Sequence, residues 1–96
     1  MLLIGDDATD RDLHAKLIDG ELSVLAAPTG ERGYALACAE EPDLVLIDGR
    51  LPDTDGLTIC RRLRANPDTA SLPVIVFTQP CSVDLLLATV HGALGR

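Results

Sequence analysis

The sequence predicts a doubly wound α/β domain, in which helices cover both faces of a parallel sheet. Short apolar runs alternate four times with segments whose apolar residues recur at helical spacing, and this alternation is typical of parallel sheets. The third and fourth runs, "DLVLID" and "LPVIVFT", lack a polar face, as strands covered on both faces do. Right-handed crossovers then make the sheet doubly wound. We expect residues 1–96 to form one domain.

The first half of the chain contains two strand–helix units. Residues 1–5 are expected to form the first strand and 9–20 the first helix, which a glycine ends. The second strand is expected at 22–27, followed by a helix at 29–40. A threonine begins each helix as a candidate cap. Pro42 stops the second helix, because the residue before a proline is pushed out of the helical region.

The second half repeats the pattern. We expect a strand at 43–48, a helix at 56–65 with Asp55 as its cap, a strand at 72–78 and a helix at 82–92. The residues of the third helix expected to face inward are Leu57, Cys60 and Leu63.

Composition argues against two classes of binding partner. The net charge of −7 disfavours direct binding to nucleic acid or to an anionic membrane surface. No apolar run approaches the ~18 residues that span a bilayer, so we expect a cytoplasmic protein without a membrane association. Its three cysteines form no CxxC pair and are expected to be small buried side chains in a reducing compartment.

Polar side chains follow three of the predicted strands. Asp6 and Asp7 come after the first strand, Asp48 ends the third and Thr78 ends the fourth. Each has an ordinary explanation alone, as a helix cap, a turn residue or a strand former. Ligands of such sheets bind outside the carboxyl ends of the strands. Because all four of these residues lie at such ends, they favour one shared site. Three repelling carboxylates are relieved by a hard cation, and Mg²⁺ is the cation that such a cluster suits.

The stretch "LIDGRLPDTDG" at 46–56 also invites a calcium-loop interpretation. An EF-hand loop needs an oxygen ligand at its first position, glycine at the sixth and glutamate at the twelfth. Aligning Gly56 with the sixth position puts Leu51 first and Arg62 last, so that interpretation fails. Asp53 is left as a solvent-facing residue.

Together these motifs resemble the receiver domain of bacterial two-component response regulators. The resemblance rests on the acid pair at 6–7, on the pattern D…P…DG across 48–56, and on "PVIVFT" ending in Thr78. It runs from Leu2 to about Leu94, and it implies a flavodoxin-like, CheY-like fold. The chain supplies four strand–helix units where the family has five. We therefore expect the sheet order 2-1-3-4, with the fifth strand and helix missing.

The resemblance also implies roles for the site residues. Asp48 would be the phosphoacceptor, and Thr78 would bind a phosphoryl oxygen and move inward when Asp48 is modified. Asp7 would bind Mg²⁺ directly, Asp6 would hold it mainly through water, and the backbone carbonyl of Arg50 would be a further ligand. The partners implied are a sensor histidine kinase or phosphotransfer protein, and an output domain or effector.

The missing unit has two expected consequences. The family's phosphoryl-binding lysine would fall beyond this chain, and the only lysine, Lys16, lies in the first helix. The fourth strand becomes an open edge, and the apolar face beside the first helix loses its cover. We therefore expect a homodimer through the fourth-strand and first-helix surfaces, or else an isolated chain that is only marginally stable.

The function expected is a Mg²⁺-dependent phosphoacceptor switch rather than an enzyme. The alternative is a phosphorylation-independent interaction or dimerisation module that retains the acid cluster without using it. A small phosphotransfer enzyme is a third hypothesis, but no second nucleophile or nucleotide-binding glycine loop supports it. Three arginines of the third helix could face a partner, although a solvated helix face explains them as well: Arg61, Arg62 and Arg64.

Overall fold

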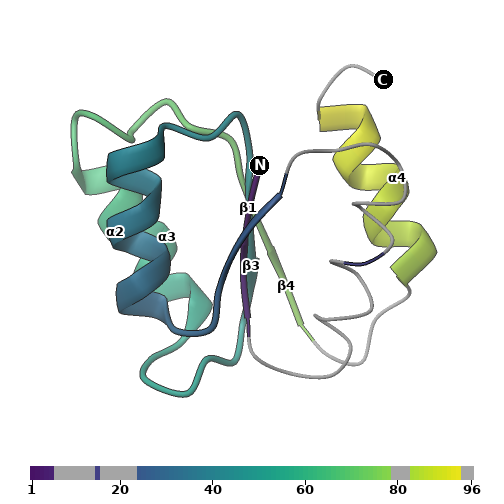
Figure 1. Cartoon of the computed structure of the whole chain (residues 1–96), viewed down its shortest axis with the longest axis horizontal. Helices are drawn as coiled ribbons and strands as arrows, with labels where there is room; N and C mark the ends of the chain where they lie inside the picture. Colours follow the sequence, from purple (N-terminus) through teal and green to yellow (C-terminus); the bar gives the residue numbers. More distant parts are fainter. Residues whose placement is uncertain (6–14, 16–23, 79–82, 94–96) are drawn as a thin grey trace.

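The computed structural model describes residues 1–5, 15, 24–78 and 83–93, and it contains a four-stranded parallel sheet (Figure 1). The strands are β1 (Leu2–Ile4), β2 (Leu25–Ala27), β3 (Val45–Asp48) and β4 (Val74–Phe77). The helices are α2 (Gly30–Glu40), α3 (Gly56–Ala65) and α4 (Val83–Ala93). Apart from residue 15, the expected helix at 9–20 lies outside the described residues.

The strand order is β2-β1-β3-β4, which confirms the order expected from the sequence. All pairings are parallel, and the central strand β1 is in register with both neighbours, so that Leu3 lies between Ala26 and Leu46. In the described part of the chain, β4 pairs only with β3. Among the described residues, the other edge of β4 has no strand beside it, as expected for the fourth strand.

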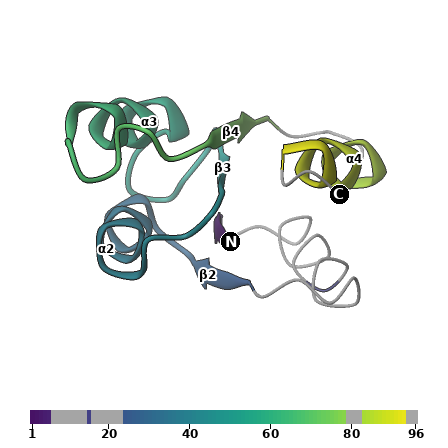
Figure 2. The ribbon, with the colours of Figure 1, turned by 90° about the horizontal axis from the view of Figure 1, so that it is seen from above.

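Strand residues alternate between two apolar layers, one on each face of the sheet. Leu2 and Ile4 point to the layer beneath α2 and α3, and Leu3 points to the layer beneath α4. Figure 2 shows this division, with α2 and α3 on one side of the sheet and α4 on the other. The first layer consists of Leu2, Ile4, Ala27, Ala37, Val45, Ile47, Ile59 and Leu63. The second consists of Leu3, Leu44, Leu46, Phe77, Leu86 and Val90.

The position of α4 corrects one expectation. The apolar face opposite α2 and α3 was expected to lose its cover, but Leu86 and Val90 of α4 pack on it and are 8% and 0% exposed. A right-handed crossover to a further strand beside β4 would have placed this helix next to α3. The helix after β4 has instead passed to the other face, where it completes the second layer. Of the two surfaces that were expected to be uncovered, only the β4 edge lacks a neighbouring element among the described residues.

The inward face of α3 also differs from the expected one. Ile59 and Leu63, four residues apart, are fully buried, whereas Leu57 is 54% exposed. Cys60 is half-buried. The expectation for Leu57 was wrong because it lies two residues before Ile59, about 200° away around the helix.

The two caps that fall in the described residues are confirmed. Thr29 begins α2, where its Oγ1 accepts a hydrogen bond from the Arg32 N–H at 3.2 Å. Asp55 begins α3, where its Oδ1 accepts from the Thr58 N–H at 2.7 Å. Glu41 follows α2 as its C-terminal cap and has the left-handed backbone angle φ 46°. No helix among the described residues is long and apolar enough to cross a membrane.

Candidate functional site

Asp48 is the last residue of β3 and lies at the carboxyl edge of the sheet. It is 1% exposed, whereas the other large, fully buried side chains among the described residues are apolar. Its Oδ1 accepts a hydrogen bond from the Arg50 N–H at 2.9 Å, which orients the carboxylate toward the start of the following loop. On β4, the residue in register with Asp48 is Phe77. The fold therefore positions one acid at the end of a central strand.

The loop between β3 and α3 is held close to Asp48 by backbone contacts. The Gly49 N–H donates to the Phe77 carbonyl at 2.7 Å, and the Gly56 N–H donates to the Gly49 carbonyl at 3.0 Å. A Cβ atom at Gly56 would lie 2.5 Å from the carbonyl oxygen of Asp48. Only glycine therefore lets the start of α3 approach the Asp48 backbone this closely.

Within the loop, Arg50 and Asp55 form an antiparallel bridge, and the Leu51 N–H donates to the Thr54 carbonyl at 3.1 Å. In extended backbone, the N–H and C=O of one residue point to the same side. By this rule, we expect the Arg50 carbonyl on the side to which the Arg50 N–H points, which is the side of Asp48. The Arg50 side chain is exposed.

Thr78 follows β4 and is exposed beside the first residue of the same loop. Its Cγ2 lies 3.0 Å from the position that a Cβ of Gly49 would occupy. A hollow of about 240 Å³ opens next to it, lined by Gly49, Asp55, Leu57, Arg61, Val76 and Thr78. The structure thus brings Thr78 next to the residue that follows Asp48, as the strand-end argument predicts.

The two acids expected at the end of β1, Asp6 and Asp7, lie outside the described residues. The described residues contain no group of three or more His, Cys, Asp or Glu that could hold a metal ion. Asp48 is therefore the member of the expected acid cluster that the structure places.

Asp53 was expected to face solvent, and its carboxylate is exposed but bonded. Its Oδ1 accepts from the Gly30 N–H at 2.8 Å, and its Oδ2 accepts from the Glu31 N–H at 3.0 Å. These two hydrogen bonds lower the pKa of Asp53 from its ordinary value of 3.8. The bond from the Thr58 N–H similarly lowers the pKa of Asp55. The sequence does not predict this contact, because Gly30 and Glu31 lie 23 and 22 positions before Asp53 and no local spacing links them to it.

Two of the three arginines on α3 have partners within the domain. Arg62 forms an ion pair with Glu31 and lies over the Tyr34 ring at 4.2 Å from its centroid. Arg64 donates to the Ala70 carbonyl at 3.0 Å. Of the three arginines that could face a partner protein, Arg61 is therefore the candidate that is left, and it lines the hollow beside Thr78.

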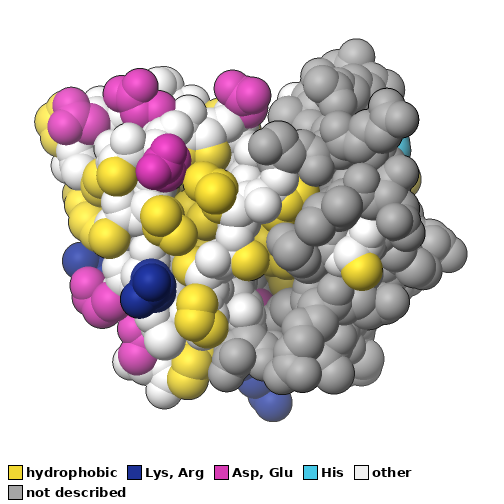
Figure 3. All heavy atoms as spheres, in the orientation of Figure 1, with side chains coloured by type: hydrophobic (Ala, Val, Ile, Leu, Met, Phe, Trp, Pro, Cys, Tyr) yellow, Lys and Arg dark blue, Asp and Glu magenta, His cyan; other side chains and the backbone are white. Residues whose placement is uncertain are grey.

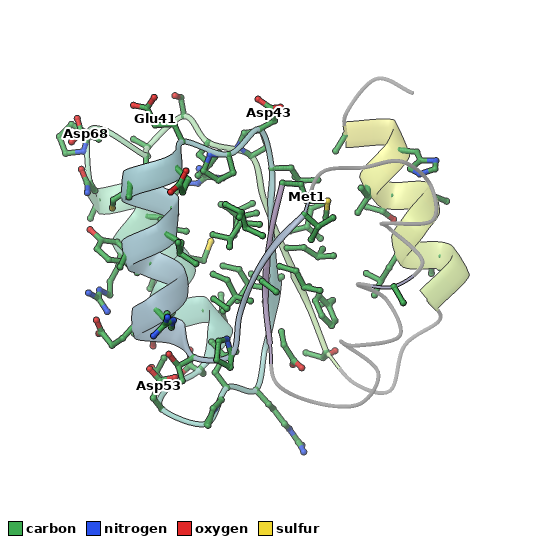
Figure 4. All side chains as sticks on the ribbon, in the orientation of Figure 1. Met1, Glu41, Asp43, Asp53 and Asp68 are labelled. Atoms are coloured by element: carbon green, nitrogen blue, oxygen red, sulfur yellow. The ribbon has the colours of Figure 1, made fainter. Side chains whose placement is uncertain are left out.

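A larger hollow of about 300 Å³ lies at the other end of the sheet. Its lining includes Glu41, Asp43 and Asp68, and Figure 4 shows these three at the end opposite Asp53. Figure 3 shows acidic side chains gathered at this end. Because the amino ends of β3 and β4 lie here, this hollow is separate from the strand-end site.

Comparisons with known proteins agree with the fold. The family profile of the response regulator receiver domain matches residues 1–94. The DNA-binding dual master transcriptional regulator RpaA of Synechocystis sp. is 39% identical over 79 residues, or 81% of this chain and 33% of RpaA. The transcriptional regulatory protein AfsQ1 of Streptomyces coelicolor is 34% identical over 94 residues, or 97% of this chain and 40% of AfsQ1. The chain thus spans less than half the length of either relative.

Solved structures show the same fold. A putative response regulator from Chloroflexus aurantiacus J-10-fl superposes with a TM-score of 0.85 at 26% identity, covering 99% of this chain and 97% of that one. The receiver domain of the sensor histidine kinase PA1611 from Pseudomonas aeruginosa PAO1 superposes with a TM-score of 0.86 at 20% identity, covering 99% of this chain and 96% of that one. That structure has a magnesium ion coordinated in its active-site cleft. From the profile match and the relatives above 30% identity, the chain belongs to the response regulator receiver domain family of two-component systems, whose members are signalling switches.

Proposed function

We propose that this receiver domain accepts a phosphoryl group on Asp48 from the phosphohistidine of a sensor histidine kinase or phosphotransfer protein. The observation that carries the proposal is the buried Asp48 carboxylate at the carboxyl end of β3, oriented by the Arg50 N–H at 2.9 Å. Ligands of doubly wound sheets bind at this edge. The neighbouring Thr78 supplies a hydroxyl at the end of the adjacent strand.

The transfer is a nucleophilic displacement at phosphorus. A carboxylate oxygen of Asp48 forms the new O–P bond, while the N–P bond of the donor imidazole breaks and its electron pair stays on the nitrogen. Catalysis of this step consists mainly of positioning and charge stabilisation. The Arg50 N–H restricts the rotation of the carboxylate, which favours an in-line approach.

The residues present suit a magnesium ion. Mg²⁺ prefers carboxylate and carbonyl oxygens, and the Asp48 carboxylate and the Arg50 carbonyl would supply one of each. The Arg50 N–H contacts the Asp48 carboxylate, which keeps residue 50 beside it. Asp6 and Asp7 follow β1, the strand next to β3, and would add carboxylates at the same edge. Bound there, the ion would offset the charge of the transferring phosphoryl oxygens. Asp48, Arg50, Asp6 and Asp7 are the residues that would hold it.

Phosphorylation would change the charge at a buried position. A phosphoryl group adds about −1.5 to −2 charge and three acceptor oxygens. Thr78, which is exposed next to Gly49, would turn to donate a hydrogen bond from its hydroxyl to one of these oxygens. This movement, and the rearrangement of the loop after β3, would carry the signal to an output domain or effector.

The proposal is tested by incubating the chain with Mg²⁺ and a small acyl phosphate, and by following the intact mass. We expect a gain of one phosphoryl group in the wild type and in the control Asp43→Asn, since Asp43 is exposed at the opposite end of the sheet. Asp48→Asn should gain none while keeping the circular dichroism spectrum of the wild type. Equal phosphorylation of Asp48→Asn and wild type would refute the assignment.

The open edge of β4 supports a homodimer. Val74 and Val76 are half-buried, and neither a charge nor a proline interrupts the strand from Val74 to Phe77. Unprotected edges of this kind pair with other strands. Antiparallel pairing of β4 with a second copy would form a self-complementary interface around a two-fold axis. A sedimentation coefficient that stays at the value of a monomer at all concentrations would contradict the homodimer.

The same edge favours the second candidate function, a phosphorylation-independent interaction module. In that function the β4 edge and the exposed Leu57 would bind a partner whatever the state of Asp48. Asp48→Asn separates the two functions. A variant that dimerises and signals as the wild type does would favour the interaction module, and one that dimerises but no longer signals would favour the switch.

A further inference from the structure

The tip of the loop between β3 and α3 is anchored to a helix more than twenty residues earlier in the chain. Asp53, near the middle of the loop 49–55, accepts the N–H groups of Gly30 at 2.8 Å and Glu31 at 3.0 Å, one on each carboxylate oxygen. Gly30 and Glu31 are the first two residues of α2. Their N–H groups have no acceptor within the helix, so the carboxylate of a distant loop satisfies them.

The contact is close as well as polar. A Cβ at Gly30 would lie 2.6 Å from Cγ2 of Thr54 in the loop and 2.9 Å from Cγ1 of Ile59 in α3, so both the loop and α3 pack directly on the start of α2. Hydrogen bonds to an ionised carboxylate are stronger than neutral ones, and the helix dipole favours a negative charge at this end. The lowered pKa of Asp53 is consistent with both effects.

The anchored tip connects to Asp48 through consecutive hydrogen bonds. Thr54, next to Asp53, accepts from the Leu51 N–H at 3.1 Å, and Gly49 accepts from the Gly56 N–H at 3.0 Å. Between these two bonds lies Arg50, whose N–H contacts the Asp48 carboxylate. A displacement of the tip therefore moves the strand of the loop that carries the Arg50 carbonyl.

We propose that Asp53 is a positioning residue, which holds the loop on the first turn of α2 and thereby fixes the Arg50 carbonyl relative to Asp48. Its effect on metal binding rests on the proposed Mg²⁺-dependent function. Asp53 touches neither the metal nor the phosphoryl group. It acts through the loop, as second-layer residues of metal sites orient the ligands in front of them.

The first test needs no metal. In the metal-free protein, amide hydrogen exchange at Leu51 and Gly56 should be faster in Asp53→Ala than in the wild type. Asp53→Asn should lie between them, because one amide oxygen can still accept one of the two N–H groups. Thr29→Ala is the matched control: it removes the cap of α2 at Arg32 and leaves the loop contact in place. Unchanged exchange at Leu51 in Asp53→Ala would overturn the proposal.

The second test is a Mg²⁺ titration followed by amide shifts, combined with phosphorylation rates. We expect Asp53→Ala to bind Mg²⁺ about tenfold more weakly, the lower end of the range for changes behind a metal ligand. At saturating Mg²⁺ its phosphorylation rate should return to within about twofold of the wild-type rate. Thr29→Ala should keep the wild-type affinity, since a general loosening of α2 does not reach Arg50.

Asp53→Ala with wild-type Mg²⁺ affinity would overturn the positioning role, as would an equal loss of affinity in Thr29→Ala. A wild-type chain that neither binds Mg²⁺ nor becomes phosphorylated would instead refute the proposed function. The exchange at Leu51 and Gly56 would then still show whether Asp53 holds the loop. The two failures are therefore distinguishable.

Discussion

Replacing Gly56 by alanine tests how closely α3 must approach the end of β3. The added Cβ would lie 2.5 Å from the Asp48 carbonyl oxygen, about 0.9 Å inside the 3.4 Å at which ordinary contact begins. It would also lie 3.0 Å from Cα of Gly49. The atoms it meets are mostly backbone, so no side-chain rotation relieves the overlap.

Overpacking of this kind costs about 1–3 kcal/mol, and alanine returns up to about 1 kcal/mol because it favours a helix more than glycine does. We expect Gly56→Ala to lose about 1–2 kcal/mol of unfolding free energy. For a domain of this size, that lowers the melting temperature by roughly 5–15 °C.

The assay is thermal unfolding followed by circular dichroism, with Gly92→Ala as the matched control. Gly92 lies in α4, and among the described residues no atom beyond its chain neighbours and the backbone of its own helix lies within 4 Å of an added Cβ, so this variant should be unchanged or stabilised by up to about 1 kcal/mol. Gly56→Ala should also be phosphorylated more slowly below its melting temperature, because Asp48 moves. A melting temperature equal to or above that of Gly92→Ala would refute the packing argument.

Three further predictions concern stability. The pKa of Asp55 is lowered from 3.8 in the folded protein, so the ionised carboxylate stabilises the fold above that pH. This stabilisation is lost as the pH falls through the lower folded-state pKa. In acid titrations below about pH 4, Asp55→Asn should therefore lose less stability than the wild type. Arg62→Ala should cost about 1 kcal/mol in urea unfolding, because it removes both the Glu31 pair and the stacking on Tyr34, and a loss no larger than that of Glu31→Gln would contradict the stacking contribution. Glu41→Gly should raise the unfolding free energy by up to about 1 kcal/mol, since glycine adopts its left-handed backbone without strain, and a destabilised variant would contradict that strain.

The fold was largely predictable because its cause is local. The apolar runs at β3 and β4, the glycine at the start of α3 and the cap at Asp55 are features of neighbouring residues, and each sits where the sequence predicts it. The side of the sheet taken by α4 was not predictable, since the run of leucines in this helix suits either face. The face is decided by contacts of Leu86 and Val90 with a layer built from distant strands.

The candidate site divides in the same way. Asp48 and Thr78 were predictable because parallel strands end at one edge, which turns position along the chain into position in space. The role of Asp53 could not be assigned from the pattern, because Gly30 and Glu31, whose N–H groups donate to it, belong to another strand–helix unit and no fixed sequence spacing links them to Asp53. Leu57 was wrongly expected to face inward, because the apolar residues of α3 can be assigned to more than one face of the helix from the sequence alone.

The central claim is that Asp48 is the residue that becomes phosphorylated. The most direct measurement is to phosphorylate the chain with an acyl phosphate and Mg²⁺, trap the product by borohydride reduction, and locate the modified residue by peptide mass spectrometry. Reduction of an aspartyl phosphate leaves homoserine, so we predict homoserine at position 48 and unmodified aspartate at Asp43, Asp53, Asp55 and Asp68. Homoserine at one of those four positions, or no modification at all, would contradict the account.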